Sequence, residues 1–309
     1  MINIVTGGAG FIGSHLIDWL MKSGEEVICL DNLCTGDRKN IARWDNHPKF
    51  KFIKHDITNP INIEVEKIWH LACPASSKNY KRDSIKTSLT NSIGTFNVLE
   101  LATKNKAKVL FTSTSEIYGN SPSNCLLESN FGYVNPNGFK SCYSEGKRLA
   151  ESLCFDFFRS HKTQIRVARI FNVYGPRIKK NDGRVISNFI YQAIDQKALT
   201  INGSGKQKRC FCYVDDIIPG LIKLMDCDFC GPINLGNPKE EYNILSIANL
   251  IKRKINVDSP FKKLPKPPDE IMKRKPSIKL AKEILNWEPK INIDLGLEKT
   301  ISYIKLEDL

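Results

Sequence analysis

The sequence lacks any apolar run that approaches the roughly 20 residues needed to span a bilayer. Its first residues, MINIVTGG, also lack the basic segment of a secretory signal and run directly into a strand pattern. We therefore expect a cytoplasmic protein with no membrane partner. At 309 residues and 41% hydrophobic, the chain is long enough for one large domain or two smaller ones, each with a core.

Acidic residues are fewer than basic ones, 33 against 46, which leaves a formal net charge of +13. The basic residues are scattered and form no stripe interleaved with aromatic side chains, so we expect no nucleic acid partner. The surplus of positive charge suits either a solvated, lysine-rich surface or a cleft for a small anionic substrate.

The ten cysteines suggest a reducing compartment rather than a disulfide framework. Several lie inside apolar runs, as Cys29 does in VICL and Cys154 in SLCFDFF, where they read as small buried hydrophobes. The spacing of the cysteines at positions 210, 212, 227 and 230 could suit zinc. The first two flank Phe211 in a strand-like run, however, and short cysteine spacings often mislead, so we expect no metal.

The first 31 residues have the pattern of a strand, a glycine-rich turn, a helix and a second strand. Gly7, Gly10 and Gly13 would let the backbone approach a pyrophosphate, which would sit at the helix N-terminus. Asp31 ends the second strand, where a carboxylate can hold the ribose hydroxyls of adenosine and would repel a 2′-phosphate. The sequence therefore predicts a dinucleotide site and favours NAD over NADP.

The alternation of strands and helices continues through KFKFIKHDI, KIWHLACPA, a helix over residues 85–104 and KVLFTST. This order predicts an α/β fold with a doubly wound parallel sheet of the Rossmann type, with ligands at the carboxyl ends of the strands. Asp56 ends the third strand and is an expected adenine neighbour. Glu116, in TSTSEIYG, is expected to lie in the cleft and to face the cofactor.

Tyr143 and Lys147 lie four residues apart, hence on one face of a predicted helix. A lysine ammonium and an oxidised nicotinamide would lower the pKa of the tyrosine towards neutrality. The phenolate could then take a proton from a sugar hydroxyl while a hydride leaves for NAD. Ser113 or Thr114, at the neighbouring strand end, would hydrogen-bond the same hydroxyl.

Several motifs together resemble those of a known family: TGGAGFIGSHL, HLACPAS, STSEIYG, YSEGK, RIFNVYGPR, NDGRVISNFI, GSGKQKR, YVDDI and RKPSIKLAKEILNWEP. They are similar to the extended short-chain dehydrogenase/reductases that act on nucleotide sugars, and among these to the UDP-glucuronate decarboxylases, or UDP-xylose synthases. The likeness runs from residue 2 to about residue 303. The glycine and Y-x-x-x-K motifs identify only the superfamily, whereas TSE, NDGRVISNF and KRKPSI are more specific to the decarboxylases.

The resemblance implies a redox-neutral, NAD-dependent decarboxylation of UDP-glucuronate to UDP-xylose through a 4-keto intermediate, with Tyr143 as base. Related 4,6-dehydratases carry an acid where Ser115 stands, and 4-epimerases usually lack the glutamate at position 116. Once carbon 4 is a ketone, the carboxyl group on carbon 5 is β to it and is lost as carbon dioxide without a base. An acid at position 115 therefore has no task and would repel the substrate carboxylate. The alternatives are an oxidative decarboxylase that releases UDP-4-keto-pentose and NADH, another nucleotide-sugar 4,6-dehydratase or epimerase, and a non-catalytic NAD-binding protein.

The resemblance also assigns residues to the site. Those expected in catalysis are Thr114, Ser115, Glu116, Tyr143, Lys147 and Arg274, the last facing the substrate carboxylate. Those expected to hold NAD are Gly7, Gly10, Phe11, Ile12, Gly13, Asp31, Asn32, Asp56, Ile57, Leu71 and Ala72, together with Tyr143 and Lys147. Those expected around UDP-glucuronate are Pro74, Ser76, Lys86, Asn172, Arg184, Val185, Asn188, Gly203, Arg209 and Arg274; backbone groups near Val185 and Gly203 would read uracil, and Lys86 would lie near the glucuronate.

Two levels of organisation are expected beyond the site. Residues 1–171 and about 208–234 would form the NAD-binding Rossmann domain, and residues 172–207 and 235–309 a smaller α/β domain that binds the nucleotide sugar. The helices near 85–104 and 143–160 carry apolar residues beyond one face. Relatives pair these helices in a four-helix bundle, so a homodimer is expected.

Overall fold

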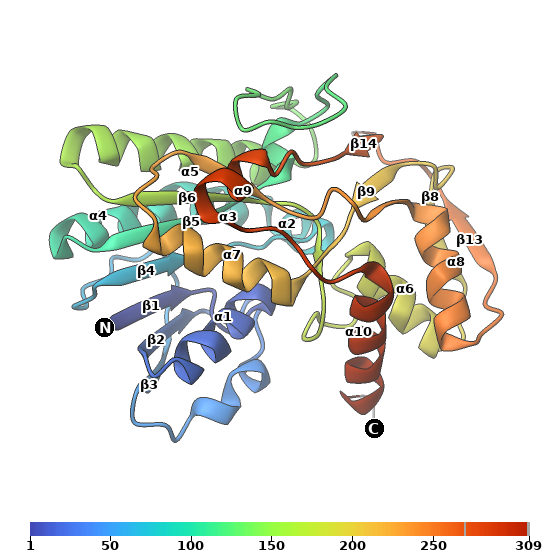
Figure 1. Ribbon diagram of the computed structural model, residues 1–309, viewed down its shortest axis with the longest axis horizontal. Coiled ribbons are helices and arrows are strands. Elements are labelled where there is room, and N and C mark those ends of the chain that lie inside the picture. Colours follow the sequence, from blue (N-terminus) through green and yellow to red (C-terminus); the bar gives the residue numbers. More distant parts are fainter. Residues whose placement is uncertain (269, 308–309) are drawn as a thin grey trace.

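The larger of two lobes is built on a parallel sheet of seven strands in this computed structural model, which describes residues 1–268 and 270–307 (Figure 1). In spatial order the strands are β11 (Pro232–Leu235), β6 (Ile165–Ile170), β5 (Lys108–Thr114), β4 (Lys67–His70), β1 (Ile2–Thr6), β2 (Glu26–Asp31) and β3 (Phe50–Lys54). The strand order reverses beside β1, which is the switch point where ligands bind in such sheets. The predicted doubly wound sheet is confirmed.

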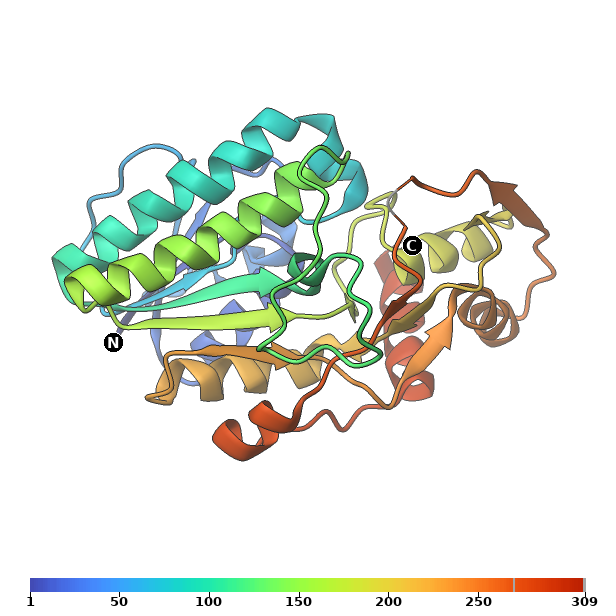
Figure 2. The ribbon, with the colours of Figure 1, turned by 90° about the horizontal axis from the view of Figure 1, so that it is seen from above.

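Helices cover both faces of this sheet, which explains why its strands are almost continuously apolar. On one face lie α3 (Ser84–Leu89), α4 (Thr95–Asn105) and α5 (Ser141–His161), with α4 and α5 side by side (Figure 2). On the other face lie α1 (Phe11–Lys22) and α7 (Val214–Asp226), with α9 (Lys279–Leu285) packed against α7 and β11.

The smaller lobe is formed by segments that leave and re-enter the larger one. It contains α6 (Val185–Ile194), α8 (Ile244–Ile255), α10 (Ile293–Glu307), β8 (Leu199–Asn202), β9 (Lys208–Cys210), β12 (Glu241–Asn243), β13 (Phe261–Leu264) and β14 (Lys273–Arg274). The short strands β7 (Val173–Tyr174) and β10 (Cys212–Tyr213) pair where the chain passes between the lobes. The structure places α7 and β11 with the sheet and brings α9 back to it as well. The expected domain division stays a prediction.

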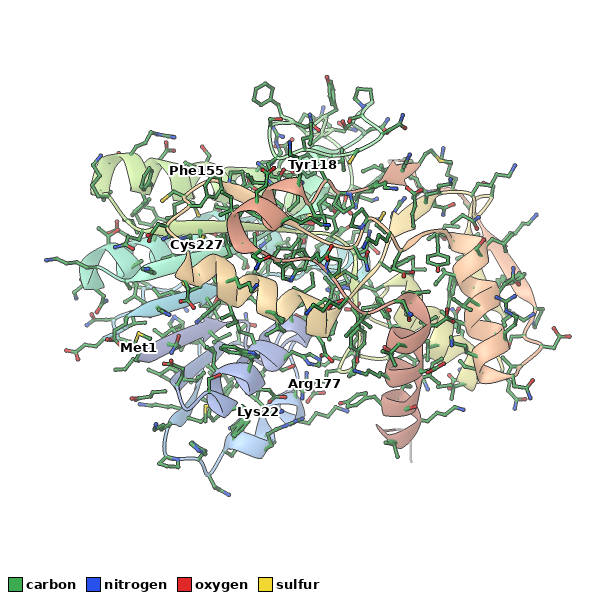
Figure 3. The ribbon with its side chains drawn as sticks, in the orientation of Figure 1. Met1, Lys22, Tyr118, Phe155, Arg177 and Cys227 are labelled. Atoms are coloured by element: carbon green, nitrogen blue, oxygen red, sulfur yellow. The ribbon has the colours of Figure 1, made fainter. Side chains whose placement is uncertain are left out.

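A single hydrophobic core joins the lobes. Buried residues of α1 and α7 belong to the same cluster as buried residues of α6, α8 and α10. An ion pair also crosses this seam, where the guanidinium of Arg177 binds the carboxylate of Asp18 on α1. Figure 3 shows the place of Arg177 between the lobes. The lobes therefore meet through a shared apolar core, and the position of one constrains the other.

The helix expected over residues 85–104 is interrupted. Residues Thr90–Gly94 form one π-helical turn between α3 and α4. A Cβ on Gly94 would lie 2.7 Å from the side chain of Ile57, so the turn packs closely on the loop after β3. Turns of this type are common beside functional sites, and this one contains Asn91, which is buried against α5.

The sequence led us to expect neither a membrane-spanning helix nor a metal site. In the ranges 1–268 and 270–307, each helix is too short or too polar to cross a bilayer. Across the same described residues, His, Cys, Asp and Glu side chains do not gather in groups of three or more that could hold a metal ion. Cys210 and Cys212 are buried, and all ten cysteines are free thiols.

Candidate active site

A cleft of about 660 Å³ opens at the carboxyl ends of the sheet strands. It is lined by the turn after β1, the segments that follow β4 and β5, the first turns of α5, the loop before α6, and side chains of β9 and β14. Almost every residue expected in the site from sequence lines this one cleft. The two that do not are Asn188, whose side chain accepts a hydrogen bond from the Gly183 amide at 3.3 Å, and Gly203, which lies beside Lys266.

The glycine turn has the shape of a cradle for a pyrophosphate. Gly7 has φ +69°, and a Cβ there would lie 2.8 Å from the Cα of Ala72. A Cβ on Gly13 would lie 2.3 Å from the carbonyl oxygen of Gly7. The start of α1 can therefore pack this closely on the turn only because position 13 has no side chain. No side chain caps the N-terminus of α1, which begins at Phe11. Its first N–H groups are therefore directed at the cleft, where they can bind an anion.

The carboxylate of Asp31 is fixed at the end of β2. It accepts hydrogen bonds from the amides of Leu33 at 2.8 Å and Ala9 at 3.0 Å. Burial raises the pKa of Asp31, and these two N–H groups oppose that rise. Two backbone bonds leave lone pairs on the carboxylate for ribose hydroxyls, so the group fits the adenosine half of NAD.

Lys86 lies at the same end of the cleft. Its ammonium is 2.8 Å from the carboxylate of Asp56 and donates to the hydroxyl of Thr58 at 3.0 Å. Although burial opposes it, this lysine lowers the pKa of Asp56 well below its usual range. In this arrangement Lys86 holds Asp56, the carboxylate expected near adenine. The place of Lys86 near the glucuronate stays a prediction.

Tyr143 and Lys147 extend from α5 towards the end of β5. The hydroxyl of Thr114, at the end of β5, faces the Tyr143 phenol and acts to lower its pKa. The Lys147 ammonium donates to the carbonyl oxygen of Thr112 at 2.8 Å and lies 4.5 Å from the ring centre of Phe111. The ammonium of Lys147 is thus hydrogen-bonded to strand β5 of the sheet, and the side chain of Tyr143 faces the cleft.

The protein's own groups do not make Tyr143 acidic. Burial raises the pKa of its phenol, and the neighbouring Cys73 thiol adds to the rise. Burial also lowers the pKa of Lys147. The lowering expected from sequence therefore needs a further positive charge at the phenol, such as that of an oxidised nicotinamide ring.

Glu116 and Arg274 form a two-pronged ion pair at the other end of the cleft. The two guanidinium nitrogens donate to the two carboxylate oxygens at 2.6 and 2.9 Å. Burial alone would raise the pKa of Glu116, but Arg274 outweighs it and lowers that pKa to about 2. Lys140 and Arg209 also act on this carboxylate.

This cluster carries a net positive charge, because its three cations (Arg274, Lys140 and Arg209) outnumber the carboxylates of Glu116 and Glu270. Burial, followed by repulsion from Arg274, lowers the pKa of Arg209 to about 10, which still leaves it protonated at neutral pH. The side chain of Arg274 is 4% exposed, and its Nε has no hydrogen-bond partner among the described residues. The site can therefore accept an anion beside Tyr143.

Sequence reasoning missed two cleft residues of evident importance. Tyr80 is buried, and its ring stacks on that of Tyr143. Lys140 lies one helical turn before Tyr143 and acts on Glu116. Lys140 could have been found from the sequence, because it lies three residues before Tyr143 and therefore on the same side of the chain. Tyr80 comes from a separate short helix, and no local sequence pattern points to it.

Comparison with known proteins gives consistent results. Residues 3–244 match the model of the NAD dependent epimerase/dehydratase family. The chain is 51% identical over 295 residues to UDP-glucuronic acid decarboxylase 6 of Arabidopsis thaliana, covering 95% of this chain and 86% of that protein. It is 48% identical over 304 residues to UDP-glucuronic acid decarboxylase 1 of Danio rerio, covering 98% and 72%.

Solved structures agree with this match. A UDP-glucuronic acid 4-epimerase of Bacillus cereus, in complex with UDP-glucuronic acid and NAD, superposes with a TM-score of 0.90 at 29% identity, covering 99% of this chain and all of that one. The UDP-glucose 4-epimerase of Thermotoga maritima, with UDP-glucose, gives a TM-score of 0.91 at 28% identity, covering both chains completely.

Proposed function

Because the chain belongs to the NAD dependent epimerase/dehydratase family, we propose that it is an NAD-dependent enzyme that converts UDP-glucuronate to UDP-xylose and carbon dioxide. The observation that carries the proposal is the cation cluster around Arg274, placed in the same cleft as Tyr143. An alcohol can be oxidised at one point of this cleft while a carboxylate is held at another. Decarboxylase names among relatives about 50% identical over 95% of the chain support the same reaction.

The residues present fit NAD. The glycine turn and the free end of α1 would hold its pyrophosphate, and Asp31 its adenosine ribose. When bound, NAD would supply reversible hydride transfer at carbon 4 of the sugar, first as acceptor and then, in its reduced form, as donor. Everything else in the reaction is left to the protein's own side chains and to the substrate.

Tyr143 would act as the base at carbon 4. Its phenolate accepts the hydroxyl proton as the hydride departs, and Thr114 holds the same hydroxyl in place. The product is a ketone at carbon 4, directly next to carbon 5, which bears the carboxylate. The carbon–carbon bond to the carboxylate then breaks, its electron pair passes into the ketone as an enolate, and carbon dioxide leaves.

The enolate takes up a proton at carbon 5, and the ketone at carbon 4 is reduced as Tyr143 returns its proton. Glu116 is the nearest acidic group to the expected carboxylate position, and its pKa of about 2 keeps it ionised. We infer that it acts by ordering water and the sugar. Ser115, buried beside it, adds no charge that would oppose the substrate.

The test is to incubate the purified protein with NAD and UDP-glucuronate, identify the product by NMR, and follow NADH by its absorbance. We expect UDP-xylose, one equivalent of carbon dioxide and no net NADH. UDP-glucose, which lacks the carboxylate, is the matched control and should give neither gas nor pentose. UDP-4-keto-pentose with stoichiometric NADH would instead identify an oxidative decarboxylase, and a 4-epimer of UDP-glucuronate would contradict decarboxylation altogether.

We also propose a homodimer that pairs the helices on one face of the sheet. Large apolar side chains on α3, α4, α5 and the π-helical turn Thr90–Gly94 are exposed: Ile85 is 74% exposed, Ile93 46%, Phe96 45% and Leu149 48%. Such a grouped apolar surface is typical of a protein–protein contact. Light scattering after gel filtration should give a dimer mass for the parent and a monomer for Phe96→Asp. Leu295→Asp, an equally exposed site on α10, should stay dimeric; a monomeric parent would contradict the proposal.

We further propose a cytosolic location, which the ten free cysteines support because disulfides rarely form in a reducing compartment. Recovery of the protein in the membrane fraction of lysed cells would contradict it.

A further inference from the structure

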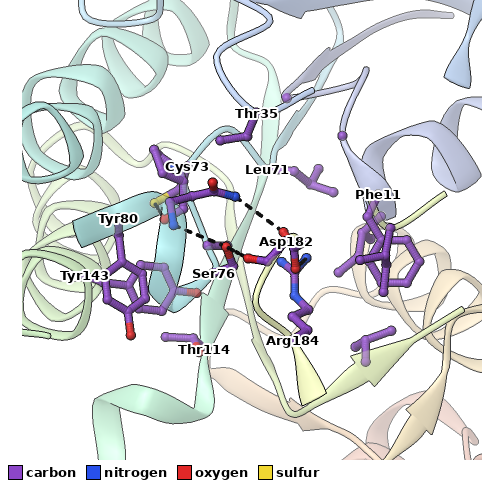
Figure 4. Close-up of a pocket in the computed structure, with 18 of the residues that line it drawn as sticks. Phe11, Thr35, Leu71, Cys73, Ser76, Tyr80, Thr114, Tyr143, Asp182 and Arg184 are labelled. Carbon is purple, nitrogen blue, oxygen red and sulfur yellow. Dashed lines mark hydrogen bonds and ion pairs between the residues drawn. The ribbon is translucent and has the colours of Figure 1, made fainter. Parts of the chain in front are cut away.

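The short helix α2 (Ser77–Arg82) places a second tyrosine against the proposed base. The ring of Tyr80 is stacked on that of Tyr143, with centroids 5.2 Å apart and planes inclined by only 8° (Figure 4). Tyr80 is 4% exposed, so the stacked pair is shielded from water on its outer side. Offset stacking of this kind favours a defined geometry between two aromatic rings.

The helix that bears Tyr80 is fastened to the loop before α6. The hydroxyl of Ser76, which caps α2, donates to the carbonyl oxygen of Asp182 at 2.7 Å. The amide of Asn79 donates to the carboxylate of Asp182 at 3.4 Å. Asp182 in turn binds the guanidinium of Arg184 at 2.8 Å, so one small network joins α2 to residues expected at the sugar nucleotide (Figure 4).

The other side of Tyr80 is fastened to the helices that carry the chemistry. Its carbonyl oxygen accepts from the Thr87 hydroxyl of α3 at 3.4 Å and from the Cys142 thiol of α5 at 3.7 Å. Cys142 directly precedes Tyr143. The backbone of Tyr80 is therefore hydrogen-bonded to Cys142, and the ring of Tyr80 stacks on the next side chain of the same helical turn, that of Tyr143.

We propose that Tyr80 is a positioning residue, which holds the Tyr143 ring at the angle needed to reach Thr114 and the substrate hydroxyl, and that α2 links this angle to the Asp182–Arg184 loop. The inference rests on the proposed function. It assigns the effect to the ring of Tyr80 and not to its hydroxyl. A base displaced by about 1 Å can lose on the order of 100-fold in rate, so a ring that fixes the base has a large effect without touching the reacting atoms.

The hydroxyl of Tyr80 is poorly suited to proton transfer. Burial raises the pKa of this phenol, and the charge of Glu116 raises it further. It therefore stays protonated at neutral pH and cannot serve as a second base.

The experiment compares Tyr80→Phe, which keeps the ring, with Tyr80→Leu and Tyr80→Met, which remove it. Measured quantities are kcat and KM for UDP-glucuronate, the dissociation constant for NAD, and the melting temperature. We expect kcat to fall about 10- to 100-fold in the leucine and methionine variants, with KM and NAD affinity within about threefold of the parent. Tyr80→Phe should restore kcat to within about threefold.

Three outcomes would overturn the proposal. Equal loss in Tyr80→Phe and Tyr80→Leu would assign the effect to the hydroxyl. A raised KM with unchanged kcat would make Tyr80 a substrate contact only, and full activity in both non-aromatic variants would leave it without a role. An inactive parent protein would instead refute the proposed function, so the two failures are distinguishable.

The link through α2 has its own readout. Ser76→Ala removes the 2.7 Å bond to Asp182, and it should lower kcat in the parent but add little to Tyr80→Leu. Such non-additivity is the mark of residues that act through one another. Additive losses in kcat would show that α2 does not connect the loop to Tyr143.

Discussion

Replacing Tyr143 by phenylalanine is expected to lower the turnover of UDP-glucuronate by about 100- to 10,000-fold, which is the usual contribution of a general base. The substitution removes only the phenolic oxygen and leaves the stacking with Tyr80 intact. NAD affinity, measured by calorimetry, should therefore stay within about threefold of the parent. Steady-state kinetics at saturating substrate gives the loss directly in kcat.

The neighbouring residue provides a matched control. Ser144 is also buried on α5, but its hydroxyl donates to the carbonyl oxygen of Lys140 at 3.0 Å and lies within its own helix. Ser144→Ala should retain kcat within about twofold while changing the same helix. If Tyr143→Phe had the same kcat as Ser144→Ala, Tyr143 could not be the base in the reaction.

Replacing Arg274 by alanine should weaken UDP-glucuronate far more than it weakens UDP. Loss of one partner from a buried, hydrogen-bonded charge pair costs about 2–5 kcal/mol, which corresponds to about 30- to 5,000-fold in affinity at roughly 1.4 kcal/mol per tenfold. UDP carries no sugar carboxylate, so its affinity should change by less than about threefold. Competition binding with the two ligands measures both values on the same protein.

The pairing with Glu116 sharpens this prediction. Without Arg274 the carboxylate of Glu116 loses the partner that lowers its pKa to about 2, so that pKa should rise. Lys273→Ala, one residue earlier on β14, removes a neighbouring charge and should leave the ratio of the two affinities unchanged. If Arg274→Ala weakened both ligands equally, the guanidinium would be bound to the diphosphate end and the assignment would fail.

The parts of the fold that could be predicted from sequence are those fixed by local pattern. The order of strand, glycine turn, helix and strand in residues 2–31 follows from spacing alone, and Tyr143 and Lys147 share a helix face because they are four residues apart. Strand ends meet at one edge in a parallel sheet. Glu116 and Asp56 were for that reason expected in the cleft, and both line it.

What could not be predicted are contacts between segments far apart in the chain. Glu116 and Arg274 are 158 residues apart, and the likeness to known families suggested that each faces the substrate rather than the other. Lys86 is bound to Asp56 because the π-helical turn after α3 packs on the loop that follows β3. Such pairings depend on how helices are set over the sheet, and single-residue patterns carry no information about that.

The sheet is completed late, because segments of the smaller lobe lie between its last two strands in the chain. Its edge strand β11 comes from residues 232–235, and α9, which packs beside it, from residues 279–285. Until the ribosome has made these segments, β6 presents an unpaired apolar edge, the kind of surface that other chains can join. The edge of β6 thus stays open while residues 171–231 are synthesised, and α9 packs beside the completed edge only after β14 has supplied Arg274.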